Sequence, residues 1–180
     1  MTEVTIRPAT PADVDALAFV AAVTFPLACP PHTTREAAAT FVIEHLGPDS
    51  FADYLSDPNR VLLVAEDDGT PIGYTMVVLG SPSDPDVAAA VAIRPTSELS
   101  KCYVVPGYHG QGVSRRLMEA SLGAAREHGA VGMWLGVNEE NSRAQRFYAK
   151  SGFERVGSKR FLVGENWEDD YVFERPLTEG

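Results

Sequence analysis

The sequence is poor in cysteine and has no long apolar run, and each shortage excludes a class of protein. Among 180 residues there are two cysteines, Cys29 and Cys102, without metal-type spacing or a CxxC motif. A disulfide framework and a cysteine metal site are therefore excluded, and we expect a reduced, cytoplasmic protein without a metal. No stretch reaches the ~20 consecutive apolar residues of a transmembrane helix. Residues 1–7 have neither the basic start nor the apolar core of an export signal, so we expect neither export nor a membrane partner.

Positive charge is also scarce. The chain has 15 lysines and arginines against 25 aspartates and glutamates, a formal net charge of −10. This balance argues against nucleic acid and anionic membrane surfaces as partners. It favours a cationic small substrate, although an acidic surface also serves solubility alone. The length suits one domain spanning residues 1–180, and 44% hydrophobic with 22% charged residues is ordinary for a globular protein.

Strand and helix patterns alternate along the chain, which is typical of an α/β protein. Apolar runs predict strands at 4–7, 60–65, 72–79, 98–105, 131–137, 153–164 and 169–176. Helical periodicity and cap residues predict helices at 10–24, 34–46, 49–55 and 113–128, and Pro26 is expected to end the first of them. A hairpin is expected at 67–70. Residues 80–95, rich in Ser, Pro, Asp and Ala, are expected to form a long irregular connection that acts as a lid or substrate loop.

The segment between Val104 and Ser114 is the most informative in the chain. An apolar strand passes through a turn at Pro106 and Gly107 directly into a helix that carries apolar residues at helical spacing. Such a turn points several backbone N–H groups and the positive end of a helix dipole at one spot, which favours an anion and above all a phosphate. Because another strand follows the helix at once, the unit is a right-handed βαβ crossover with two parallel strands.

Two signatures in this region resemble those of the GCN5-related N-acetyltransferase (GNAT) family. The first is the family's Gln/Arg-x-x-Gly-x-Gly/Ala turn, which reads here His109-Gly110-Gln111-Gly112-Val113-Ser114. His109 and Ser114 depart from the pattern, while Gly112, where the chain must approach a ligand closely, is kept. The second, Asn-x-x-Ala-x-x-x-Tyr-x-x-x-Gly-Phe, matches residues 141–153 at every anchor. The resemblance implies an α/β fold with a single mixed, mostly antiparallel sheet of about six to seven strands, a central parallel βαβ unit and helices on both faces.

The same resemblance implies acetyl-CoA as cosubstrate. Backbone N–H groups of the glycine turn would hold its pyrophosphate, so the unusual side chain at the first position costs little. Asn141 is suited to cap the following helix, and in the family the matching asparagine also touches the pantetheine arm. The N–H of Val104 would stabilise the oxyanion where neighbouring strands splay apart. The implied coenzyme-binding residues are Tyr103, Val104, His109, Gly110, Gln111, Gly112, Val113, Ser114 and Asn141.

Acetyl transfer to an amine needs one group that removes a proton and another that supplies one. An alkyl ammonium with a pKa of ~10.4 is almost fully protonated at neutral pH, and Glu98, at the start of the strand that leads to the glycine turn, is the candidate base. Its structural alternative is an ion pair with Lys101. Tyr148 is the candidate acid for the departing sulfur, the alternative being core packing beside Phe147. Cys102 has no neighbouring histidine, so direct attack in a ternary complex is favoured over an acetyl-cysteine.

The acceptor is less well defined by the sequence. The acidic end at residues 167–171 loosely resembles bacterial polyamine acetyltransferases, and an acidic pocket would attract a polyamine or another small cationic amine. Protein amino groups stay open as acceptors, as does a non-catalytic acetyl-CoA sensor, which would bind the coenzyme without releasing its thiol. A homodimer is also open. His32, His45 and His128 have no ligand spacing and are expected to be structural or exposed.

Overall fold

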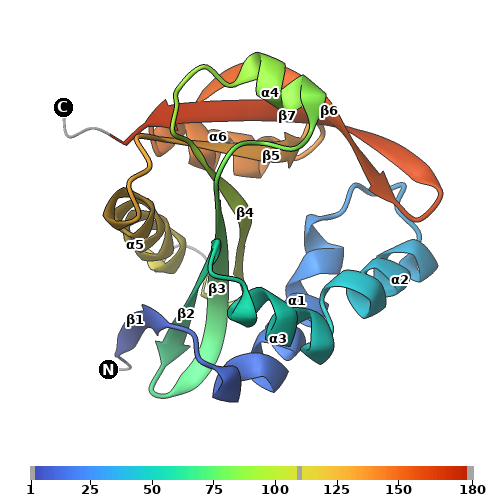
Figure 1. The fold of residues 1–180 in the computed structure, drawn as a ribbon. Coiled ribbons are helices and arrows are strands. Elements are labelled where there is room, and N and C mark those ends of the chain that lie inside the picture. Colours follow the sequence, from blue (N-terminus) through green and yellow to red (C-terminus); the bar gives the residue numbers. More distant parts are fainter. Residues whose placement is uncertain (1–2, 109–110, 178–180) are drawn as a thin grey trace.

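One sheet of seven strands runs through the computed structural model, which describes residues 3–108 and 111–177 (Figure 1). The strands are β1 (Val4–Pro8), β2 (Arg60–Asp67), β3 (Thr70–Leu79), β4 (Ser97–Val104), β5 (Gly132–Asn138), β6 (Glu154–Val163) and β7 (Asn166–Pro176). The helices are α1 (Val14–Ala28), α2 (Arg35–His45), α3 (Pro48–Ser56), α4 (Pro85–Ala90), α5 (Val113–Glu127) and α6 (Ser142–Lys150), with a 3-10 turn at Pro11–Asp13 before α1.

The strand order is β1-β2-β3-β4-β5-β7-β6. Neighbouring strands are antiparallel except β4 and β5, which run parallel and are connected through α5. The predicted α/β class, the mixed and mostly antiparallel sheet and the central βαβ unit are therefore confirmed. The β2–β3 hairpin also turns where predicted, with Asp68 and Gly69 at φ values of 52° and 84°.

Alternating side chains show how both faces of the sheet are covered. Leu62 and Val64 of β2 point to the face that packs against α1, α2 and α3, whereas Leu63 points to the opposite face and packs against α5. On β5, Trp134 faces α4, while its neighbour Leu135 faces α5 and α6. Helices therefore flank both faces, as predicted, with α1–α4 on one and α5 and α6 on the other (Figure 1).

Helix α1 continues through Pro26 to Ala28, so the predicted end of this helix at residue 24 is wrong. Proline removes a single helical N–H, which is a small loss so close to the end of a helix. The last turn is held by packing instead, because Phe25 is buried and stacks on Phe41 of α2 with 4.5 Å between ring centroids. Tertiary contact thus outweighs the local signal of the proline.

Residues 80–95 are not irregular throughout, contrary to the sequence expectation. They contain α4, whose first N–H groups are capped by the carboxylate of Asp84. Val87 of α4 is fully buried beside Trp134. The Glu174 carboxylate of β7 then accepts hydrogen bonds from the N–H groups of Ala92 and Ile93 at 3.1 and 3.0 Å. The segment therefore packs over β5 and β7. At the other end of the chain, β7 begins at Asn166, earlier than predicted.

The stretch Pro11–Ala28 is long and apolar enough to cross a membrane by length and composition alone. Its inner face contains Leu17, Val20 and Ala21, which are at most 1% exposed and pack against β2, β3 and α3. Packing of this kind is what a core helix beside a sheet provides.

Candidate active site

Strands β4 and β5 separate soon after they meet. Their ladder pairs Glu98 with Trp134, and just before that pair the Ser97 hydroxyl donates a hydrogen bond to the Gly132 carbonyl at 2.9 Å. Within the described residues no later pair joins the two strands, and Figure 1 shows β5 turning away from β4. This is the splay that the family resemblance implied, and it opens the middle of the sheet.

Two cavities meet at this opening. The glycine-turn cavity, of about 420 Å³, is bounded by residues 112–115 at the start of α5 and by Arg143 and Phe147 of α6. The carboxylate cavity, of about 270 Å³, contains Glu98 and Asp170. Both cavities share the walls Ala28, Cys102, Tyr103, Asn141, Ala144 and Tyr148. Molecules bound in the two cavities would therefore meet at these shared residues.

The glycine turn provides a wall that suits an anion. Gly112 is the N-cap of α5 and has a φ of 78°, in the left-handed region that favours glycine. A side-chain carbon built on Gly112 would meet no atom within 4 Å, so the position borders open space. The first N–H groups of a helix lack intrahelical partners, and those of α5 border the cavity.

The predicted coenzyme residues fall into three groups. Those that line the glycine-turn cavity are Tyr103, Val104, Gly112, Val113, Ser114 and Asn141. Gln111 is exposed, and its side-chain amide donates to the Gly107 carbonyl at 3.0 Å instead. His109 and Gly110 lie outside the described residues. Two cations that the sequence analysis did not single out, Arg115 and Arg143, also line this cavity. Their signal was their position, since Arg115 directly follows the first signature and Arg143 lies within the second.

Tyr148 stands where the two cavities join. It belongs to α6, a helix that Asn141 caps by accepting a hydrogen bond from the Ala144 N–H at 3.1 Å. The Tyr148 ring packs between Phe147 and Phe153, at 5.4 and 6.1 Å between centroids. Burial raises the pKa of the Tyr148 phenol well above its usual range, so the phenol keeps its proton at neutral pH. Core packing and proton donation are thus compatible.

The cysteines are unsuited to nucleophilic attack. Burial raises the pKa of the Cys102 thiol to about 12. Burial, aided by the charge of Glu168, raises the pKa of Cys29 to about 11. Since the thiolate is the reactive form, both side chains remain inert thiols at neutral pH.

The carboxylate cavity contains charges of both signs. Burial raises the pKa of Glu98, against the effect of the cations Lys159, Lys101 and Arg60. Burial likewise lowers the pKa of Lys101 to about 8, while Glu98 acts in the opposite direction. Glu98 and Lys101 therefore each favour the charged form of the other, and both side chains line the cavity.

Sequence reasoning noted Asp170 only as part of the acidic end at residues 167–171 and gave it no catalytic role. Asp170 of β7 lies 3.7 Å from the Lys159 ammonium of β6, measured from Oδ2 to Nζ, and the two side chains are only 9% and 14% exposed. Burial raises the pKa of Asp170 to about 6, although Lys159 acts to lower it. The one available signal was the alternation along β7, which puts Glu168 and Asp170 on the same side of the strand.

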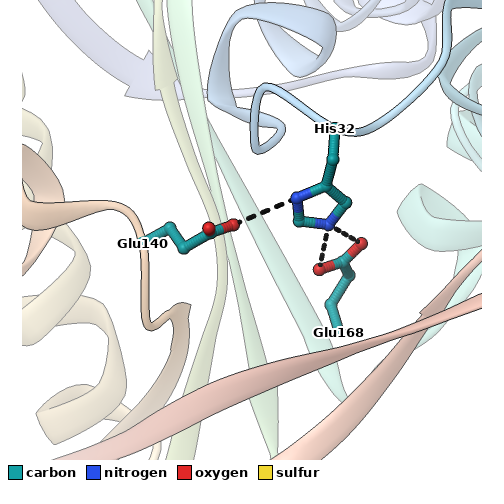
Figure 2. A group of neighbouring side chains, drawn as sticks. All are labelled: His32, Glu140 and Glu168. Carbon is teal, nitrogen blue, oxygen red and sulfur yellow. Dashed lines mark hydrogen bonds and ion pairs between the residues drawn. The ribbon is translucent and has the colours of Figure 1, made fainter.

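His32, in the connection between α1 and α2, contacts Glu168 at the edge of the carboxylate cavity (Figure 2). Its Nε2 lies 2.7 and 2.9 Å from the two oxygens of Glu168, and its Nδ1 lies 3.3 Å from a Glu140 oxygen. The two carboxylates thus approach different ring nitrogens. These contacts join the α1–α2 connection to β7 and to the segment before α6, which gives His32 a structural role.

A turn suited to phosphate, a parallel strand pair that opens, and a protonated phenol between two cavities define a coenzyme-dependent group transferase. Residues 28–153 match the Acetyltransferase (GNAT) family, and the chain belongs to that family.

Known N-acetyltransferases resemble this chain over 71–97% of its length. An uncharacterized N-acetyltransferase of Mycobacterium tuberculosis is 48% identical over 165 residues, which cover 92% of this chain and 98% of that protein. The N-alpha-acetyltransferase RimI of the same organism is 30% identical over 128 residues, 71% of this chain and 73% of that protein. The crystal structure of the PaiA N-acetyltransferase from Thermoplasma acidophilum in complex with coenzyme A has the same fold, with a TM-score of 0.77, 19% identity and coverage of 97% and 99% of the two chains.

Proposed function

We propose that this protein transfers the acetyl group of acetyl-CoA to a primary amine by direct attack in a ternary complex. The observation that carries the proposal is the pair of cavities with common walls at the β4–β5 opening. One cavity offers helix N–H groups and arginines to a diphosphate, and the other offers carboxylates to an ammonium. The thioester and the amine would then meet beside Tyr148.

The coenzyme belongs in the glycine-turn cavity. Its pyrophosphate would lie on the N–H groups of residues 112–114, and its pantetheine arm would follow the cavity between β4 and Asn141 toward Tyr148. The Val104 N–H is proposed for the oxyanion, and the Tyr148 phenol for protonation of the departing sulfur. The solved PaiA relative in complex with coenzyme A supports this choice of cosubstrate.

Direct attack is favoured over an acetyl-enzyme because no shared wall is a good nucleophile. Cys102 is the one shared wall with a thiol, and its pKa of about 12 keeps that thiol protonated. Removal of a proton from the ammonium falls to a carboxylate of the other cavity. Three carboxylates line that cavity, and Glu168 is already in contact with His32. The candidates are therefore Glu98, which the sequence predicts as the base, and Asp170, which it does not.

The acceptor is proposed to be a small cationic amine. The carboxylate cavity holds three acids, Glu98, Glu168 and Asp170, against the two lysines Lys101 and Lys159. A single negative charge in excess and a volume of about 270 Å³ suit one ammonium group better than several. A polyamine would therefore insert one end only.

The two free thiols suit a reducing compartment such as the cytoplasm.

A protein amino terminus is the second candidate acceptor. The observation in its favour is the 30% identity to the N-alpha-acetyltransferase RimI over 71% of this chain. An amino terminus also carries one ammonium, so the charge of the cavity does not separate it from a small amine.

A thiol-release assay tests the proposal. Acetyl-CoA is incubated with spermidine, ethanolamine or a peptide with a free N-terminal alanine, and the free coenzyme thiol is measured beside calorimetric titration of acetyl-CoA. We expect binding without amine and thiol release with at least one amine. Tight binding without release from any of the three would instead indicate a coenzyme sensor.

A further inference from the structure

Asp170 reaches the carboxylate cavity because the neighbouring strand has no side chain at that point. In the β5–β7 ladder Asp170 is opposite Asn138. Its carboxylate leans over Gly136, where a built side-chain carbon would lie 3.4 Å from Oδ2 and would overlap Cε of Lys159. Glycine at this position therefore leaves room for both charged side chains. Gly136 and Asp170 border the cavity just past the point where β4 and β5 separate.

The groups around Asp170 leave it a reactive carboxylate. Lys159 of β6 is its cationic neighbour, while Glu168 and Asp169 of β7 act with burial to raise the pKa of Asp170 to about 6. Burial also raises the pKa of the Tyr103 phenol on β4, and the charge of Asp170 is among the smaller causes. Asp170 is thus close enough to act on Tyr103, a wall that both cavities share.

Glu98 has different surroundings. It lies at the last β4–β5 pair, before the strands open. The charges that act on it are those of Lys159, Lys101 and Arg60, all of them cations. Glu98 is therefore suited to compensate the lysines of the cavity, and Asp170 is the acid on the side of the opening.

We propose that Asp170 receives the ammonium group of the acceptor and accepts its proton, with Lys159 holding that place in the free protein. This assignment rests on the proposed acetyl transfer. On binding, the ammonium takes the place of the Lys159 ammonium, which turns toward Glu98. One proton then passes from the acceptor nitrogen to a carboxylate oxygen of Asp170, leaving a neutral amine and a carboxylic acid.

The remaining steps balance without another reactant. The nitrogen lone pair forms the C–N bond at the thioester carbonyl, the C–S bond breaks, and the thiolate takes the Tyr148 proton. The second proton lost by nitrogen restores the Tyr148 phenol, and Asp170 releases its proton to solvent. A carboxyl with a pKa near 6 accepts a proton from an ammonium about 10²-fold more favourably than one at the ordinary value of 3.8.

The test compares Asp170→Asn with Asp169→Asn, which changes an exposed carboxylate of the same strand. Thiol release is measured with spermidine, ethanolamine and the alanine peptide across about pH 5 to 8, and acetyl-CoA affinity by calorimetry. Because Asp170 must be ionised to accept the proton, kcat/KM of the parent protein should fall as the pH drops through about 6. Asp170→Asn should lower kcat/KM at least about 10²-fold and abolish this decline, with acetyl-CoA affinity unchanged. Asp169→Asn should keep the rate and an acidic decline, and this decline should lie at slightly lower pH because the Asp169 charge helps to raise the pKa of Asp170.

Two further measurements separate proton transfer from a structural role. Trifluoroethylamine is mostly neutral at neutral pH and brings no proton to remove, so the defect of Asp170→Asn should shrink at least about 10-fold with this acceptor. A structural defect would affect all amines alike. If Asp170→Asn fails to fold, the pH dependence of kcat/KM is measured for Lys159→Gln instead. This variant lacks the cation that lowers the pKa of Asp170, so the acidic decline of kcat/KM should move to higher pH.

The outcomes distinguish the two proposals. If the parent protein binds acetyl-CoA but releases no thiol with any of these amines, the acetyl transfer and the role of Asp170 both fail. If the parent is active and Asp170→Asn keeps its rate and its acidic decline, the transfer stands and the assignment of Asp170 is wrong. An acidic decline that stays in place in Lys159→Gln would overturn the assignment in the same way.

Discussion

Replacing Tyr148 with phenylalanine removes one hydroxyl from the junction of the two cavities and leaves the ring in place. The ring contacts with Phe147 and Phe153 remain, so the melting temperature should not change. The wall of the glycine-turn cavity also keeps its shape, so the Kd of acetyl-CoA should stay the same. The loss should therefore appear in turnover, where the departing thiolate no longer finds a proton donor.

The expected size follows from the general-acid role. A positioned acid contributes about 10²- to 10⁴-fold, so the barrier should rise by ~2.7–5.4 kcal/mol. Single-turnover thiol release measures it, and Tyr171→Phe is a matched control because Tyr171 packs on the same cluster but lines neither cavity. Turnover of Tyr148→Phe equal to that of the control would refute the role of Tyr148 as the acid.

Three further predictions use other parts of the structure. Gly112→Leu should lower the free energy of unfolding by about 1–2 kcal/mol because residue 112 has a left-handed backbone. It should also weaken acetyl-CoA binding, measured by calorimetric titration, at least about 10²-fold. The control Gly123→Leu, which is also in α5 with open space around it, should bind acetyl-CoA normally. Gly136→Ala should fold, but its added methyl group would overlap the Lys159 side chain and displace it from Asp170. KM for amines should therefore change while the Kd of acetyl-CoA does not. An unchanged KM would contradict this description of the cavity. Asp13→Asn should lower the free energy of unfolding at pH 7 by ~1–3 kcal/mol, because Asp13 accepts two hydrogen bonds from Arg7 at 2.8 and 2.9 Å. Since Arg7 lowers the pKa of Asp13 from 3.8 to about 2, this stabilisation is complete above 3.8 and lost as the pH falls through about 2, so urea denaturation of the two proteins should converge there.

The parts of the site that could be predicted depend on local backbone rules. The strand–turn–helix pattern around Gly112 predicts a helix that starts at an open anion site, and the structure has that geometry. The capping role of Asn141 follows from its side chain alone. The signature spacing then brings Tyr148 two turns along the same helix to the shared wall.

The parts that escaped prediction depend on pairing between distant strands. Asp170 enters the cavity only because β7 pairs with β5 in a register that places it beside Gly136, and nothing in its own neighbourhood encodes that register. The continuation of α1 past Pro26 likewise requires the stacking of Phe25 on a helix that follows later in the chain. The helix α4 was different, because its cap, Asp84 before a proline, was visible in the sequence.

The most direct test of the central claim is a crystal structure of the protein with bound acetyl-CoA. The measured quantity is the distance from the thioester sulfur to the Tyr148 hydroxyl oxygen. The account predicts a separation of about 3–4 Å, with the pyrophosphate on the N–H groups of residues 112–114. A sulfur atom remote from Tyr148, or a pyrophosphate bound away from the glycine turn, would contradict it.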